Sequence, residues 1–137
     1  MFSQTQIVDI TDGSSNTLLL SENDVAPDGT DPANFSATAG MDNRGRIYNP
    51  GGCLLFSTLY LPNTTEPDAL NYCQPIPAAP CALTSTDMNL SARSYHMGGV
   101  NAAMADGSVR FFSNTIDSQV WNALGTRSGN EPIPDSY

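Results

Sequence analysis

His96 is the single histidine of the chain, and the residues around it could support general base chemistry. Nine residues separate it from Asp106, and Ser94 lies two residues before it. A carboxylate that orients an imidazole, which then takes a proton from a hydroxyl, is an arrangement typical of nucleophilic hydrolases. Asp106 is followed by Gly107, however, and this pair predicts a tight turn between two strands. We therefore expect Asp106 to serve the turn and His96 to mark the entry to the hairpin.

Distance also argues against a catalytic pair of His96 and Asp106. Residues 100–105 cover about 20 Å in an extended strand, at about 3.3 Å per residue. Ser94 and His96 can face the same way, because alternate residues of a strand share a face. The sequence offers no third member of a triad, so we expect no enzymatic activity.

Carboxylates are the preferred ligands of calcium, and Asp24, Asp28 and Asp31 form their densest cluster. Their spacing fails the EF-hand pattern, since Ala26 and Phe35 stand at two of its ligand positions. We expect a solvated acidic loop without a cofactor, with calcium binding as the alternative. A single histidine and the lack of a Cys-x-x-Cys motif argue against zinc.

The three cysteines, Cys53, Cys73 and Cys81, cannot all pair within one chain. Cys73 and Cys81 flank a short proline-rich stretch. A disulfide between them would suit an extracytoplasmic protein and would stabilise it by about 2–3 kcal/mol. A bridge from Cys53 to either partner and three free thiols are the other interpretations, and the sequence leaves the choice open.

Two apolar runs on either side of Asp106-Gly107 predict a β-hairpin with a two-residue turn. This turn sets the register, with Met104 opposite Val109. Because a lone hairpin is marginally stable in water, another element must cover its apolar face. On this register the apolar face comprises Val100, Ala102, Met104, Val109 and Phe111.

A short helix over residues 118–124 is the best candidate to cover the hairpin. Asp117 is its expected N-cap, and Gly125 stands where a C′ glycine belongs. Its apolar side comprises Val120, Trp121 and Leu124. The other expected elements are a core strand over 17–21, further strand over 54–61, long loops over 23–43 and 62–82, and a frayed tail over 128–137.

Four segments of the chain resemble the prepilin-type processing-associated family, which is characterised by an H-X9-DG motif. These are pilin-like proteins, abundant in planctomycetes, with a C-terminal domain of unknown function. His96, Asp106 and Gly107 match the motif, residues 109–112 follow it, and residues 121–129 match the family's closing W-x-A-L-x-T-R-x-G. The fourth segment, DGxSNTxxxxE, is matched by Asp12, Gly13, Ser15, Asn16, Thr17 and Glu22.

The resemblance implies the globular head of a pilin or pseudopilin, a non-catalytic structural protein of the bacterial cell envelope. Its partners would be other pilin-like subunits or the secretion machinery of a type II secretion or type IV pilus-like system. A prepilin leader and a hydrophobic N-terminal helix would precede this chain and would be its contact with the membrane. Glu22 would face solvent or pair with an arginine such as Arg93.

An extracellular binding module, for a glycan or a surface and with or without calcium, is the alternative function. Exposed rings at Tyr60, Tyr72 or Phe35 would favour it, because sugars stack on aromatic rings.

Length and composition are consistent with one mainly β domain, with an antiparallel sheet, long loops and a short C-terminal helix. The chain has 137 residues, enough for a core, and its 11 glycines and 10 prolines favour turns and short strands. Counting the implied N-terminal helix would make it α+β. Acidic residues outnumber arginines 14 to 5, lysine is lacking, and the net charge is −9. This charge argues against nucleic acid and anionic membranes as partners.

Overall fold

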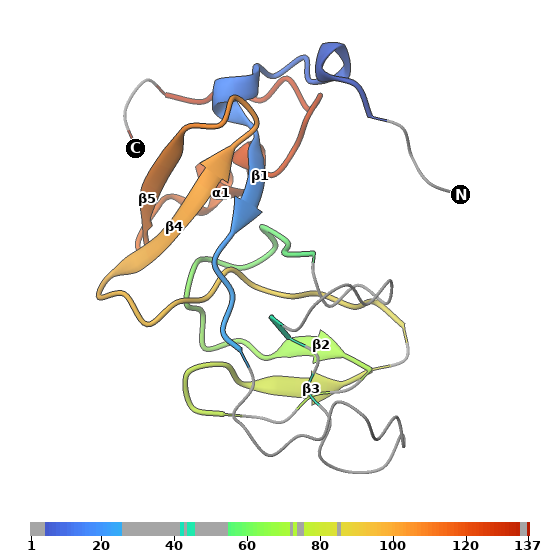
Figure 1. The fold of residues 1–137 in the computed structure, drawn as a ribbon, viewed down its shortest axis with the longest axis vertical. Helices are drawn as coiled ribbons and strands as arrows, with labels where there is room; N and C mark the ends of the chain where they lie inside the picture. The colour runs from blue at the N-terminus through green and yellow to red at the C-terminus, as the bar shows by residue number, and fades with distance from the viewer. Residues whose placement is uncertain are drawn as a thin grey trace.

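The computed structural model describes residues 5–25, 42, 44–45, 55–71, 73, 76–84, 86–134 and 137. As predicted, the fold is mainly β; a three-stranded antiparallel sheet lies above a two-stranded parallel sheet in Figure 1. Within this described part, no helix has the length and apolar character needed to span a membrane. The elements are η1 (Ile7–Asp9), η2 (Ser14–Asn16), β1 (Leu18–Ser21), β2 (Asp68–Leu70), β3 (Cys81–Leu83), β4 (Gly99–Met104), β5 (Val109–Ser113) and α1 (Ser118–Leu124).

The β4–β5 hairpin forms as predicted, but its register is shifted by one residue. Ala103, not Met104, pairs with Val109. The cause is a turn of three residues instead of two: Met104 N donates to Ser108 O at 2.8 Å, and Gly107 N donates to Met104 O at 3.0 Å. Gly107 has φ 85°, the left-handed conformation that closes such three-residue loops.

This shift turns the side chains of β5 to the opposite face of the sheet. Val109 and Phe111 were expected in the core but are 68% and 54% exposed, whereas Phe112 is only 2% exposed. The face of β4 is as predicted, because Val100, Ala102 and Met104 are buried. The core comprises Ala92, Val100, Ala102, Met104, Phe112, Ile116, Trp121 and Leu124.

Helix α1 has the predicted bounds and covers the buried face of the hairpin. Its N-cap is Asp117, whose Oδ1 accepts hydrogen bonds from Gln119 N at 2.8 Å and Val120 N at 3.1 Å. The Trp121 ring lies 5.5 Å from that of Phe112. The indole Nε1 donates to Tyr60 O at 2.9 Å, so the buried ring keeps its polar atom paired.

Gly125 does not adopt the left-handed conformation expected of a C′ glycine, since its φ is −82°. It is constrained by space instead: a Cβ at this position would overlap the side chain of Thr58. A glycine after a helix can thus be required by a closely packed neighbouring side chain, without adopting the left-handed conformation of a turn.

The strand predicted over 17–21 forms as β1, but it lies at the edge of the large sheet, next to β4, and is not the core strand that was predicted. An irregularity in its pairing between Leu18 and Leu20 breaks the alternation of its side chains. Leu19 and Leu20 are 57% and 63% exposed as a result, and only Leu18 packs against the core. The described residues 55–61 contain one isolated bridge, from Ser57 to Ser91, and not the strand that was expected.

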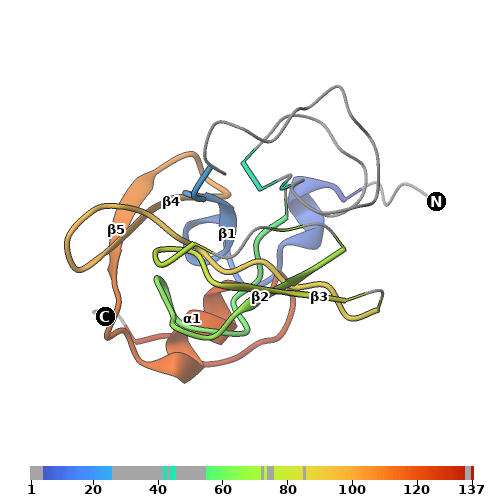
Figure 2. The same ribbon diagram turned by 90° about the horizontal axis from the view of Figure 1, so that it is seen from below.

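The smaller sheet falls on the stretch predicted as a loop over 62–82, and only Leu83, the last residue of β3, lies beyond it. Strands β2 and β3 pair in parallel, with Asp68 opposite Cys81. In the view from below, this pair is nearest the viewer and β4–β5 lies to one side (Figure 2). The prolines of the stretch lie outside both strands, so they do not interrupt the three-residue ladder.

The expected fraying of the tail is also not observed in its described residues, 128–134 and 137. Ile133 packs against the core, and the Tyr137 ring stacks on Phe112 at 6.1 Å. The Tyr137 hydroxyl accepts a hydrogen bond from Arg110 Nη1 at 2.7 Å. The tail therefore returns to β5.

Candidate functional site

The motif residue Asp106 is used in the hairpin turn, far along β4 from His96. Its Oδ1 accepts hydrogen bonds from Ser108 Oγ at 2.7 Å and Ser108 N at 2.8 Å. The hydroxyl of Ser108, followed by its N–H, lowers the pKa of the Asp106 carboxyl. The backbone of the turn is hydrogen-bonded to the DGxSNTxxxxE segment, residues 12–22, which is the first motif segment in the order of the chain: Asp106 N donates to Ser14 O, and Ala105 N donates to Thr17 O.

The motif residue Asp12 binds the segment that follows α1. Its Oδ1 accepts from Asn130 N at 2.9 Å, and its Oδ2 accepts from Gly129 N at 2.8 Å and Thr126 Oγ1 at 3.0 Å. The Asn130 N–H is the main cause of the lowered pKa of Asp12, and the other two bonds act in the same direction, against the opposing effect of desolvation.

The other residues of the first motif segment support this arrangement. Gly13 has φ 94°, which favours glycine, and leads into η2, where Ser15 and Asn16 lie. Asn16 Nδ2 donates to Asp12 O at 3.4 Å, and Thr17 Oγ1 lies 3.1 Å from Gly13 O and 3.3 Å from Thr126 O. The segment thus joins the start of the described chain to its last segment.

Glu22 and His96, the remaining motif residues, meet at the entry of β4. Glu22 Oε1 lies 3.0 Å from His96 Nε2, and Glu22 Oε2 accepts from Asn101 N at 2.8 Å. Desolvation works against the charge of Glu22, but the bonds from Asn101 and the charge of protonated His96 outweigh it and lower its pKa. The expected partner, Arg93, contacts Glu22 only through its backbone, by donating its N–H to Glu22 O at 3.1 Å.

This pair is the carboxylate–imidazole arrangement that a hydrolase would need, with Glu22 in place of Asp106. His96 is 57% exposed at its side chain, and it lies on the rim of an open groove with Ser94. The Ser94 hydroxyl, however, donates to Gly99 O at 2.8 Å, and its oxygen accepts from His96 N at 3.1 Å. The imidazole therefore does not hold this hydroxyl as a nucleophile.

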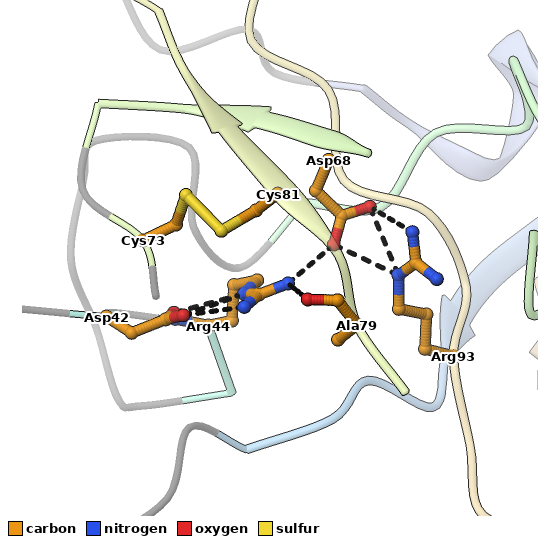
Figure 3. The surroundings of a disulfide bond; sticks show 7 residues. All are labelled: Asp42, Arg44, Asp68, Cys73, Ala79, Cys81 and Arg93. Atoms are coloured by element: carbon orange, nitrogen blue, oxygen red, sulfur yellow. Dashed lines mark hydrogen bonds and ion pairs between the residues drawn. A yellow bond between two sulfur atoms is a disulfide. The ribbon is translucent and has the colours of Figure 1, made fainter. Parts of the chain in front are cut away.

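A second cluster, which the sequence did not reveal, is a buried network of charges around Asp68 (Figure 3). Asp68 lies between two arginines, with Oδ2 3.0 Å from Arg44 Nη1 and Oδ1 3.0 Å from Arg93 Nη2. Arg44 also forms a forked pair with Asp42, at 2.6 Å between Nη2 and Oδ2. All four side chains are at most 1% exposed.

Backbone carbonyls complete the network. Arg93 Nη1 and Nη2 donate to Thr64 O at 2.7 Å and Glu66 O at 2.8 Å, and Arg44 Nη1 donates to Ala79 O at 2.8 Å. Desolvation disfavours the charge on Arg44, but its bonds to Asp42 and Asp68 outweigh this cost and raise its pKa. Since buried charges are tolerated only when paired and hydrogen-bonded, the network fixes the relative positions of these segments.

Cys73 and Cys81 form a disulfide beside this network, with their Cα atoms 6.3 Å apart (Figure 3). The bridge links the start of β3 to the segment that follows β2. The third cysteine, Cys53, lies outside the described residues.

Of the three calcium candidates, Asp28 and Asp31 lie outside the described residues, as do Phe35 and Tyr72. Asp24 is buried, at 4% exposure, and its Oδ2 has no hydrogen-bond partner among the residues that the structure describes. Burial raises its pKa, against the opposing charges of Arg93 and Arg44. The described residues contain no group of three His, Cys, Asp or Glu side chains that could hold a metal ion.

The comparison with protein families gives one match, over residues 2–119, to a family described as a protein of unknown function (DUF1559). The chain belongs to this family. The match includes the DGxSNTxxxxE segment and the H-X9-DG motif, and the segment 121–129 follows it. No curated protein and no solved structure matches this DUF1559 chain.

Proposed function

We propose that this chain is the globular head of a pilin-like or pseudopilin-like protein, a non-catalytic structural component of the bacterial cell envelope. It would be associated with type II secretion or type IV pilus-like assembly, and its partners would be other pilin-like subunits or the secretion machinery. In this proposal the head lies outside the cytoplasm and is carried on a hydrophobic N-terminal helix made with a prepilin leader.

The observation that carries the proposal is the way in which the motif carboxylates are used. Asp12 and Glu22 each accept a backbone N–H from a residue distant in the sequence, Asn130 and Asn101 respectively. Asp106 stabilises the turn that rests on the first motif segment. Motif residues whose side chains hold the sheet and its neighbouring segments together support a structural role for this domain. The Cys73–Cys81 disulfide supports a location in an oxidising compartment.

Cell fractionation tests the proposal directly. The full gene product, epitope-tagged, is followed in its native cells with and without an active prepilin peptidase. We expect a processed form in the envelope or in the fraction sheared from the cell surface, and an unprocessed form retained in the inner membrane without the peptidase. A product of unchanged mass in the cytoplasm of both strains would contradict the proposal.

The non-catalytic part of the proposal is tested at His96. Because the Ser94 hydroxyl is bonded to Gly99 O, we expect a screen of ester, peptide and glycoside substrates to give the same background rates for the native chain and for His96→Ala. A hydrolytic rate that the native chain has and the variant lacks would make the chain an enzyme that uses the Glu22–His96 pair.

A further inference from the structure

An open groove of about 530 Å³ lies where the large sheet meets the disulfide-linked segment, and its size is in the range of small-ligand sites. One wall is formed by residues 77–80, which carry two prolines and an alanine on the groove. The polar side chains that line it are Asn63, Thr64, Thr65, Ser94, His96 and Asn114.

The groove differs in charge from the rest of the molecule. The chain carries 14 acidic residues and a net charge of −9, yet the described residues that line the groove include no aspartate, glutamate, lysine or arginine. Without carboxylates it lacks the ligands for a metal cation, and without lysine or arginine it lacks those for a phosphate or carboxylate. Its amides, hydroxyls and imidazole match a neutral ligand rich in hydroxyl groups.

The groove is preorganised by Asn63, which has a positive φ of 52°. Its Nδ2 donates to Asn114 Oδ1 at 2.9 Å and to Gly99 O at 3.2 Å, and its Oδ1 accepts from Ser94 N at 2.7 Å. This left-handed conformation is uncommon outside glycine, and asparagine is among the residues that tolerate it best. Asn63 thus ties three of the segments that line the groove into one frame.

Several polar groups are left over once this frame is built. Asn114 uses its Oδ1 for Asn63, and the structure gives its Nδ2 no protein partner among the described residues. The Thr65 hydroxyl likewise makes no hydrogen bond there. His96 uses Nε2 for Glu22, and its Nδ1 also has no partner among the described residues. These groups provide a donor amide, a hydroxyl and a ring nitrogen for a ligand.

We infer that this groove binds a neutral saccharide, with hydrogen bonds from Asn114 Nδ2, the Thr65 hydroxyl and His96 Nδ1. The proline-bearing wall at 77–80 would contact the less polar C–H face of a sugar ring. A peptide fits less well, because the common modes of peptide recognition use a free strand edge, an apolar or aromatic-lined groove, or an arginine cluster. The groove lies beyond the end of β5, and its described lining has no phenylalanine, tyrosine, tryptophan or arginine. The inference is independent of the structural role proposed above.

An NMR titration of the isotopically labelled chain tests the inference. The probes are neutral tetrasaccharides of glucose, mannose and N-acetylglucosamine, with tetragalacturonate, inorganic phosphate and a basic peptide as charged comparisons. We expect chemical-shift changes confined to residues around the groove for at least one neutral sugar, and none there for the charged probes.

Two variants locate the binding. Thr65→Val removes an unpartnered hydroxyl, and Asn114→Asp keeps the oxygen that Asn63 needs but removes the donor amide. Each should weaken binding about threefold to tenfold, the loss of one hydrogen bond. The matched controls Thr86→Val and Asn122→Asp lie outside the groove and should bind like the native chain.

The inference is overturned by any of three results: no neutral sugar binds more tightly than about 1 mM, the shift changes map to another surface, or both groove variants bind as well as their controls. Capture of a charged probe in the groove also overturns it. If Asn114→Asp does not fold, Thr65→Val decides alone, since Thr65 is exposed and its hydroxyl has no hydrogen-bond partner among the described residues.

Discussion

The two sheets of this molecule are held in place by different forces. The large sheet packs a continuous apolar core against α1, with Trp121, Val100 and Leu124 fully buried. The β2–β3 pair has strands of three residues, too short to be stable alone. It relies instead on buried ions around Asp68 and on the Cys73–Cys81 disulfide.

The difference shows how a chain can order a region whose described residues contribute few buried apolar side chains, chiefly Leu70, Ala79 and Leu90, outside the main core. Arg93 belongs to the network while its neighbour Ala92 belongs to the apolar core, so a single extended segment joins the two regions. Each region should therefore respond to its own kind of perturbation.

The largest effect is expected from Asp68→Ala, which leaves Arg44 and Arg93 buried without their shared partner. The loss of one member of a buried ion pair costs about 3–5 kcal/mol in the free energy of unfolding. Urea unfolding measures it, with the exposed Asp87→Ala as control, expected within about 0.5 kcal/mol of the native chain. A loss of stability for Asp68→Ala as small as that of the control would show that the buried network does not stabilise the fold.

In the apolar region, Phe112→Ala should destabilise the fold by about 3–4 kcal/mol, because it removes a buried ring beside Trp121. Its neighbour Phe111 is the matched control: it is 54% exposed, and Phe111→Ala should cost less than about 1 kcal/mol. Thermal or urea unfolding of the two variants tests the three-residue turn. A two-residue turn would bury Phe111 in place of Phe112, so Phe111→Ala would then be the more destabilising substitution.

The disulfide should matter less than Asp68. We expect the double variant Cys73→Ser, Cys81→Ser to lose about 2–3 kcal/mol, the entropy of closing a short loop. Hydrogen exchange should show the loss concentrated in β2–β3, with β4 protected as before. Equal loss of protection in β4 would mean that the two regions unfold as one.

Acid should have opposite effects on the contributions that Glu22 and Asp24 make to the stability of the fold. The pKa of Glu22 is lowered on folding, so its ionisation stabilises the fold at neutral pH, and this contribution is lost as the pH falls through the lowered pKa. The pKa of Asp24 is raised by burial, so its ionisation costs stability at neutral pH, and acid relieves that cost.

The variants Glu22→Gln and Asp24→Asn separate these two contributions. At pH 7, Glu22→Gln should lower the unfolding temperature and Asp24→Asn should raise it. Both differences from the native chain should shrink towards about pH 3. A pH-independent difference for either variant would show that its carboxyl charge is not the cause.

Local signals in the sequence were enough to predict α1 and the existence of the hairpin. A capping aspartate and the spacing of Trp121 and Leu124 act within one turn of helix, so no distant partner is needed. The register of the hairpin was not accessible in this way, because Asp-Gly is compatible with turns of two and of three residues.

Contacts between distant residues were largely beyond prediction. The motif drew attention to Glu22 and His96, but nothing in the sequence indicated that two residues 74 positions apart would pair. Asp68, Arg44 and Arg93 lie in polar or proline-rich surroundings that resemble a solvated loop. Only the fold makes them neighbours, and so their burial has no local signature.

The contacts of Asp12 have a mechanical consequence. They fasten the start of the described chain to residues 126–130, directly after α1. A force applied at the amino-terminal side is therefore transmitted both to β1 and, through Asp12, to the segment that follows α1. Neither connection passes through β2–β3. A pull on this end would load the part of the molecule with the densest apolar packing and spare the part that depends on ions.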